Sequence, residues 1–247
     1  MSVDPVVVDD ARGRGAVEAA ALGFRPVAVV FDMDGTMIES ERELLVCWRQ
    51  ATQELGLAID DGVWLSMVGL HDRACVELLH RHLPADDVAR LIATTHALYD
   101  AKVAAGLPLK PDIEPLLQWL REKGVPRAVA TSTQRPRALR KLEHAGLLDY
   151  FDVVVAGADV DHPKPAPDIY LLAANRLGVD PRACVAVEDS EPGVRAALAA
   201  GMTAIQIPDL VQPTAPVRAL GHRIVASLAQ VHALLEGALR DGGLRRD

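Results

Sequence analysis

Short apolar runs alternate with helical stretches over most of this 247-residue chain. Predominantly apolar runs of strand length occupy residues 27–31, 128–130, 153–156, 184–187 and 203–207, which indicates strands buried on both faces. Helical periodicity occupies residues 113–123, 136–145, 168–177 and 192–200. A glycine follows each of these helices, at positions 124, 146, 178 and 201, where a left-handed residue suits a helix end. This alternation predicts an α/β fold, with a parallel sheet and helices on both faces.

The alternation is interrupted between residues 42 and 107. Helical patterns cover residues 43–55, 61–68, 74–80 and 85–105, and a proline-containing linker follows at residues 107–111. We therefore expect an all-helical domain of residues 42–107, inserted into a core domain made of residues 25–41 and 108–247. Residues 1–24 lack a clean period, and we expect them to form a flexible extension.

Composition and charge exclude several classes of function. A net charge of -8 and a pI near 5.5 argue against a surface for nucleic acid or anionic membrane. No apolar run approaches the ~20 residues of a membrane span, and the N-terminus does not resemble a signal peptide. Cys47, Cys75 and Cys184 stand far apart in apolar stretches, which is typical of reduced, buried thiols. We expect a cytoplasmic protein.

Polar side chains stand at the ends of three predicted strands. The first strand ends in FDMDGT (31–36), with Asp32 and Asp34 one residue apart; the second is followed by TST (131–133), and the fourth by Glu188 and Asp189. Parallel strands end at one edge of the sheet, and ligands bind at that edge in open α/β sheets. At least three carboxylates and a hydroxyl should therefore converge.

Converging carboxylates repel one another and need a cation. An all-oxygen donor set favours Mg²⁺, and no histidine or cysteine spacing typical of a zinc site is present in the sequence. Lys164 stands between prolines in a loop after the third predicted strand, so the position of its ammonium group should be well defined. A rigid lysine beside a carboxylate–Mg²⁺ cluster predicts a pocket for a phosphate group.

The motifs DMDGT (32–36), TST (131–133), KPAP (164–167) and EDS (188–190) resemble the four motifs of the haloacid dehalogenase-like (HAD) superfamily. The helical insert resembles the C1 cap of its phosphatase and β-phosphoglucomutase branch. The resemblance covers about residues 26–207. It implies a Rossmann-like core with a small helical cap, and an Mg²⁺-dependent phosphatase that works through an aspartyl phosphate.

The resemblance also implies roles for individual catalytic residues. Asp32 corresponds to the nucleophile, and Asp34 corresponds to the general acid and base. Thr131 and Lys164 correspond to the residues that bind the phosphate group. This assignment is physically reasonable, because Mg²⁺ and a lysine would remove the repulsion between a phosphate dianion and a carboxylate.

The implied metal site consists of Asp32, Asp34 through its main-chain carbonyl, Asp189, and Glu188 as an inner ligand or a helper. Gly35 permits the turn after Asp34. Ser132 and Gly35 join the implied phosphate site.

The four motifs distinguish between three enzyme classes and one non-enzyme class. A dehalogenase needs no acid for a halide leaving group, so Asp34 argues against that class. A phosphomutase of the β-phosphoglucomutase type would carry a His, an Arg and a Lys where this chain has Leu44, Asp72 and Gln134. A phosphatase fits best, and a non-catalytic HAD-like binding protein is a further alternative that the four intact motifs disfavour.

Residues 67–73 resemble the substrate-specificity loop of the cap, in which Gly69, His71 and Arg73 are candidate substrate contacts. A cap of this size favours a small organic phosphate ester as partner. Phosphorylated sugars, polyols, glycolate and nucleoside monophosphates all remain possible. The resemblance to C1-capped phosphatases favours a monomer over an oligomer for this chain.

Overall fold

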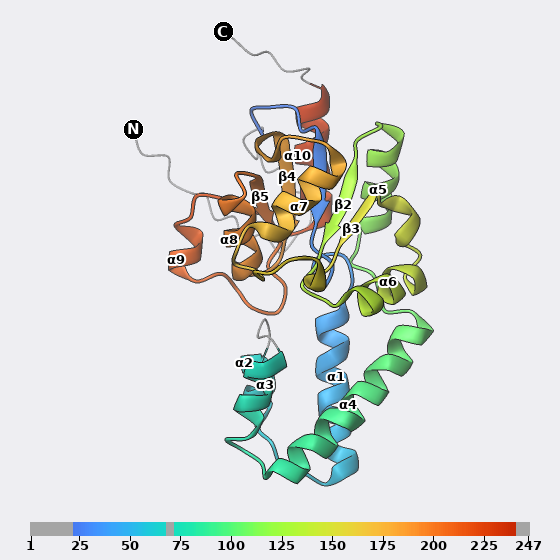
Figure 1. Ribbon diagram of the computed structural model, residues 1–247, viewed down its shortest axis with the longest axis vertical. Coiled ribbons are helices and arrows are strands. Elements are labelled where there is room, and N and C mark those ends of the chain that lie inside the picture. The colour runs from blue at the N-terminus through green and yellow to red at the C-terminus, as the bar shows by residue number, and fades with distance from the viewer. Residues whose placement is uncertain (1–21, 68–71, 241–247) are drawn as a thin grey trace, which may run out of the picture.

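The computed structural model describes residues 22–67 and 72–240 (Figure 1). Its sheet has the strand order β3-β2-β1-β4-β5-β6. The strands are β1 (Ala28–Phe31), β2 (Arg127–Ala130), β3 (Val153–Val155), β4 (Cys184–Glu188), β5 (Thr203–Gln206) and β6 (Arg223–Ile224), and each neighbouring pair is parallel. The predicted α/β fold is therefore confirmed, and each apolar run predicted to be a strand forms one.

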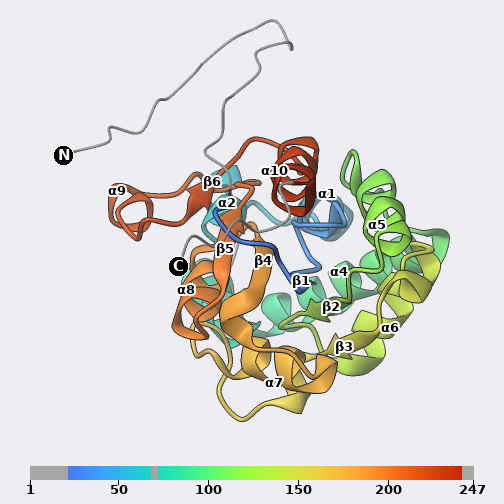
Figure 2. The ribbon, with the colours of Figure 1, turned by 90° about the horizontal axis from the view of Figure 1, so that it is seen from above.

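Helices cover both faces of the sheet. In β1, Val29 and Phe31 belong to one hydrophobic cluster, whereas Ala28 and Val30 belong to another, because successive side chains point to opposite faces. The first cluster includes α5 (Ile113–Glu122), α6 (Arg135–His144) and α10 (Leu228–Arg240), and the second includes α7 (Asp168–Leu177) and α8 (Glu191–Ala199). Figure 2 shows α7 and α8 on the opposite side of the sheet from α5 and α10. The short helix α9 (Ala215–Arg218) precedes β6.

The predicted helix-ending glycines adopt the expected conformation. Gly124, Gly146, Gly178 and Gly201 have φ between 65° and 81°. A residue with a side chain is strained in this region, so glycine allows the chain to leave each helix and turn toward the next strand.

Four further helices form a separate layer with its own hydrophobic core: α1 (Ser40–Leu55), α2 (Asp61–Met67), α3 (Asp72–Leu79) and α4 (Ala85–Ala105). They correspond to the four helical stretches predicted within residues 42–107. Trp48 and Trp64 stack at its centre, with ring centroids 5.5 Å apart. We call α1–α4 the helical layer. None of the described helices is both long and apolar enough to cross a membrane.

The helical layer lies beyond the carboxyl end of β1 (Figure 1). Two linkers connect it to the sheet, and they pair through an antiparallel bridge between Ile38 and Leu109. The main-chain N–H of Lys110 donates a hydrogen bond to the carbonyl of Met37 at 2.9 Å. Helix α4 also packs against α6, and Leu210 packs against the core of the helical layer. The strand ends therefore face this layer.

Candidate active site

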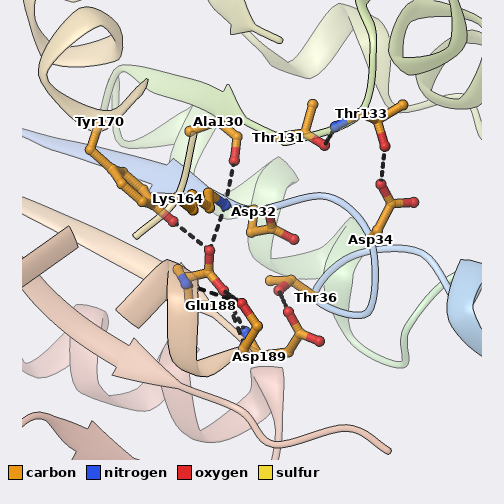
Figure 3. Close-up of polar contacts among 12 residues, drawn as sticks. Asp32, Asp34, Thr36, Ala130, Thr131, Thr133, Lys164, Tyr170, Glu188 and Asp189 are labelled. Atoms are coloured by element: carbon orange, nitrogen blue, oxygen red, sulfur yellow. Dashed lines mark hydrogen bonds and ion pairs between the residues drawn. The ribbon is translucent and has the colours of Figure 1, made fainter. Parts of the chain in front are cut away.

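The strand ends assemble the polar residues that the sequence predicts to meet. Asp32 follows β1, Thr131 follows β2, and Glu188 is the last residue of β4. Because β1 lies between β2 and β4 in a parallel sheet, all three residues lie at the same edge (Figure 3). Each of the three residues is buried.

Lys164 lies at the centre of this group. Its ammonium nitrogen is 2.6 Å from Asp32 Oδ1, 2.6 Å from Glu188 Oε1 and 3.0 Å from the carbonyl oxygen of Ala130. These contacts satisfy its three N–H donors. Its side chain is only 6% exposed, so the ammonium group has a defined position, as predicted for a lysine between prolines.

Glu188 has both carboxylate oxygens occupied. Oε1 accepts hydrogen bonds from Lys164 at 2.6 Å and from the hydroxyl of Tyr170 at 2.8 Å. Oε2 accepts from the main-chain N–H groups of Asp189 and Ser190, each at 3.1 Å, and from the Ser190 hydroxyl at 3.0 Å. Glu188 therefore fixes Lys164 and the turn after β4 at the same time.

Asp189 lies beside the turn that follows Asp34. Its Oδ1 accepts a hydrogen bond from the Thr36 hydroxyl at 3.3 Å, and its main-chain carbonyl accepts one from the Gln206 side chain at 2.9 Å. A Cβ at Gly35 would lie 2.3 Å from Asp189 Oδ2, and Gly35 has φ +80°. Gly35 is therefore required both for the turn and for the close approach of Asp189.

Asp32, Glu188 and Asp189 form an acidic cluster in which one oxygen of each residue lies within 4.8 Å of the others. Burial raises the pKa of Asp32 to about 8; Lys164 acts against that shift and Glu188 adds to it. Burial, followed by repulsion from Glu188 and Asp32, raises the pKa of Asp189 well above its usual range. One lysine does not balance three carboxylates, so the cluster suits a divalent cation.

Asp34 points to a different set of partners. Its Oδ1 accepts hydrogen bonds from the Ser40 hydroxyl and the Lys141 ammonium, each at 2.6 Å, and its Oδ2 accepts one from the Thr133 hydroxyl at 2.6 Å. Burial acts to raise the pKa of Asp34, but Lys141 and these hydrogen bonds lower it overall. These three hydrogen bonds therefore fix the position of the Asp34 side chain next to the acidic cluster.

The other predicted phosphate-binding residues lie at the end of β2. Thr131 Oγ1 accepts a hydrogen bond from the main-chain N–H of Thr133 at 3.1 Å, which leaves its own hydroxyl proton available to a ligand. Ser132 is exposed. Gly157 packs directly against the Ser132 carbonyl, since a Cβ there would lie 2.3 Å from that oxygen.

The structure does not describe the side chains of the candidate substrate contacts predicted within residues 67–73. Gly69 and His71 lie outside the described residues, and Arg73 falls in the first turn of α3, where the structure does not describe its side chain. Their role remains a prediction.

Sequence reasoning does not single out Lys141 or Ser40, which both hold Asp34. A signal for Lys141 is present, because it shares the buried face of α6 with Ala138 and Leu142 at helical spacing. A lysine on an apolar helix face needs a buried partner. Tyr170 belongs to the KPAPDIY segment, but its hydrogen bond to Glu188 follows only from the packing of α7 against the sheet.

A buried lysine and an acidic cluster at the carboxyl edge of a parallel sheet, beneath a helical layer, are the features of an α/β enzyme. Residues 27–201 match the model of the haloacid dehalogenase-like hydrolase family, and the chain belongs to that family.

Several relatives are phosphatases by name, including one from Escherichia coli and one from Thermotoga maritima. The chain is 36% identical to the fructose-1-phosphate phosphatase YqaB of Escherichia coli, over 74% of this chain and 97% of the relative. It is 32% identical to a phosphorylated carbohydrates phosphatase of Thermotoga maritima, over 72% and 83% of the two chains. A crystal structure of a putative β-phosphoglucomutase from Thermotoga maritima superposes with a TM-score of 0.73 at 27% identity, over 87% and 99%. With its family, these relatives make the chain a phosphoric monoester hydrolase.

Proposed function

We propose that the chain transfers the phosphoryl group of a small-molecule phosphate monoester first to Asp32 and then to water, with Mg²⁺ at the acidic cluster. The observation that carries this proposal is the 2.6 Å contact between Lys164 and Asp32 within that buried cluster. A carboxylate that must attack a dianionic phosphate needs positive charge beside it, and Lys164 supplies part of that charge.

The residues at the cluster fit Mg²⁺ because all the donor atoms are oxygens and negative charge is in excess. Asp32 and Asp189 would hold the ion, together with the main-chain carbonyl of Asp34. Glu188 is a further candidate ligand, although its existing hydrogen bonds also suit it to hold Lys164 in place. When bound, Mg²⁺ supplies positive charge for the phosphate oxygens and the attacking carboxylate.

The first step forms a bond between an Asp32 oxygen and phosphorus while the bond from phosphorus to the ester oxygen breaks. The leaving oxygen takes the proton of Asp34 in its carboxylic acid form, so the alcohol leaves neutral. Lys164 and the Thr131 hydroxyl stabilise the phosphoryl oxygens during the transfer.

In the second step, a water oxygen attacks phosphorus and gives a proton to the Asp34 carboxylate. The bond between phosphorus and Asp32 breaks, which releases inorganic phosphate and restores both aspartates. Splitting the hydrolysis in this way replaces one difficult reaction with two easier ones.

The phosphate group would lie among Lys164, Thr131, Ser132 and the turn at Gly35. The leaving group would then face the helical layer, and we propose that residues 42–107 form a cap over the site. Gly69, His71 and Arg73 are our candidates for contacts with it. The names of the relatives favour a phosphorylated sugar.

A phosphomutase is the second candidate, supported by the likeness to a putative β-phosphoglucomutase. Leu44, Asp72 and Gln134 depart from the residues that the resemblance associates with mutases. Isomerisation of glucose 1-phosphate without release of phosphate would favour the mutase over the phosphatase.

The proposal is tested by assaying phosphate release from a panel of sugar, polyol, glycolate and nucleoside phosphates with Mg²⁺. We expect turnover of at least one ester, with kcat lowered by at least about 10³-fold in D32N because the nucleophile is lost, and activity lost on chelation. The matched control is D161N, since Asp161 is exposed on the loop that carries Lys164.

Full activity in D32N would refute the assigned nucleophile. Failure of the wild-type protein on every ester would instead support a non-catalytic binding protein.

A further inference from the structure

Three side chains from different parts of the chain hold the Asp34 carboxylate. Ser40 begins α1, Lys141 lies on α6, and Thr133 follows β2. A carboxylate offers about four acceptor positions. Ser40 and Lys141 occupy both positions on Oδ1, and Thr133 occupies one on Oδ2. The one remaining position is therefore on Oδ2.

Lys141 is buried, with 8% of its surface exposed. Its ammonium nitrogen lies 2.6 Å from Asp34 Oδ1 and 5.1 Å from the centroid of the Tyr99 ring, which belongs to α4. A buried ammonium group is costly unless it is paired. The pair with Asp34 offsets that cost and joins α6 of the core, the turn after β1, and the helical layer at one point.

We propose that Lys141 is a positioning residue for proton transfer to the leaving group. It holds Oδ1 so that Oδ2 carries the proton toward the ester oxygen, and its positive charge faces the negative charge that Asp34 acquires. This inference rests on the proposed function. As the phosphorus–ester bond breaks, the Oδ2–H bond also breaks, a new O–H bond forms on the leaving oxygen, and the electron pair stays on Asp34 beside Lys141.

A specific consequence follows for different leaving groups. A p-nitrophenolate ion is stable enough to leave without a proton, whereas phenolate and alkoxides depend more strongly on the acid. Loss of Lys141 should therefore slow the hydrolysis of esters with poor leaving groups much more than the hydrolysis of p-nitrophenyl phosphate. A purely structural role would slow all esters alike.

The experiment compares kcat/KM for phenyl phosphate and p-nitrophenyl phosphate in the wild-type protein and in K141M. The two esters are nearly the same size, and kcat/KM includes only the steps up to departure of the leaving group. We expect the preference for p-nitrophenyl phosphate to rise by about tenfold or more in K141M, within the range that general acids contribute. K141R, which keeps the charge, should recover part of this change.

The design separates the possible outcomes. Both esters are measured on one preparation, so a loss of folded protein cancels in the ratio. R140M is the matched control, since Arg140 is exposed on the same helix, and its ratio should equal that of the wild type. If K141M does not fold, K141Q provides the same ratio.

An unchanged ratio in an active K141 variant would overturn the role of Lys141 and leave the proposed function intact. Wild-type protein that hydrolyses neither of these two esters nor any sugar, polyol, glycolate or nucleoside phosphate of the panel would overturn the proposed function itself.

Discussion

At Glu188, a fully buried carboxylate accepts hydrogen bonds from five donors on Lys164, Tyr170, Asp189 and Ser190. A buried carboxylate is tolerated only when its oxygens are satisfied in this way. The consequence is rigidity: Lys164 cannot move away from Asp32 without breaking a charge-assisted hydrogen bond to Glu188.

A partly buried carboxylate, Asp159, stabilises the chain just after β3. It pairs with Arg135 and Arg176, and it accepts a hydrogen bond from the main-chain N–H of Ala156 at 3.1 Å. Both arginines also donate hydrogen bonds to the carbonyl of Val154. Chiefly because of the hydrogen bonds from Arg135, the pKa of Asp159 falls to about 2.

We predict that D159N lowers the free energy of unfolding by about 1 kcal/mol at neutral pH. The pKa shift of Asp159 alone would give a larger value, but solvent screens its pairs with the two partly exposed arginines. A folded-state pKa of about 2, below the usual 3.8, gives stability that is present above pH 4. That stability is lost as pH falls through 2. The difference between wild type and D159N in urea unfolding should therefore shrink between pH 4 and pH 2. A difference that grows over this range would contradict the assignment.

Helix α8 packs closely against the acidic cluster. Ser190 caps the helix by accepting a hydrogen bond from the main-chain N–H of Gly193 at 3.2 Å. A Cβ at Gly193 would lie 1.7 Å from Glu188 Oε1. The helix can approach β4 this closely only because position 193 has no side chain.

We predict that G193A lowers the free energy of unfolding by about 1–3 kcal/mol, because the new methyl group displaces the Glu188 carboxylate. The control is G237A in the interior of α10, where a Cβ meets nothing within 4 Å. That substitution should raise stability by up to about 1 kcal/mol, since alanine favours helix more than glycine. Urea unfolding measures both variants, and equal behaviour of the two would rule out the close packing at Gly193.

At the scale of the whole molecule, an ion-pair network joins the sheet to the helical layer. Asp209, in the loop after β5, accepts hydrogen bonds from Arg42 of α1 and forms an ion pair with Lys110 of the return linker, each at 2.7 Å. The Asp209 side chain is only 4% exposed. The next residue, Leu210, packs on the core of the helical layer. This loop is therefore a further connection between the two parts, besides the linkers and the packing of α4 against α6.

We predict that D209A lowers the free energy of unfolding by about 2 kcal/mol, as expected when a largely buried carboxylate loses its charge-assisted contacts. The matched control is E191A, which removes an exposed pair with Arg195 and should cost less than about 0.5 kcal/mol. Urea unfolding of both variants at one salt concentration makes the comparison. A loss in D209A no larger than in E191A would show that the network does not stabilise the protein.

Local patterns in the sequence are sufficient to predict most of the elements. Buried strands and amphipathic helices carry their period in consecutive residues, so β1 to β5 and α1 to α8, including α4 over residues 85–105, follow from apolar spacing. Helix α9 does not, because its four residues are too few to show a period. The 3₁₀ turns at residues 148–150, 157–159 and 181–183 escape prediction for the same reason.

The sequence by itself determined the alternation of strands and helices, and it placed Asp32, Asp34, Thr131 and Glu188 at or just after strand ends. Parallel pairing then brings such ends together, whatever the details of packing. Only the tertiary structure decided that Lys141 holds Asp34, that Gly193 makes room for Glu188, and that Asp209 joins the sheet to the helical layer. These contacts depend on the angle and distance between elements that are far apart in the chain, and no local pattern encodes that geometry.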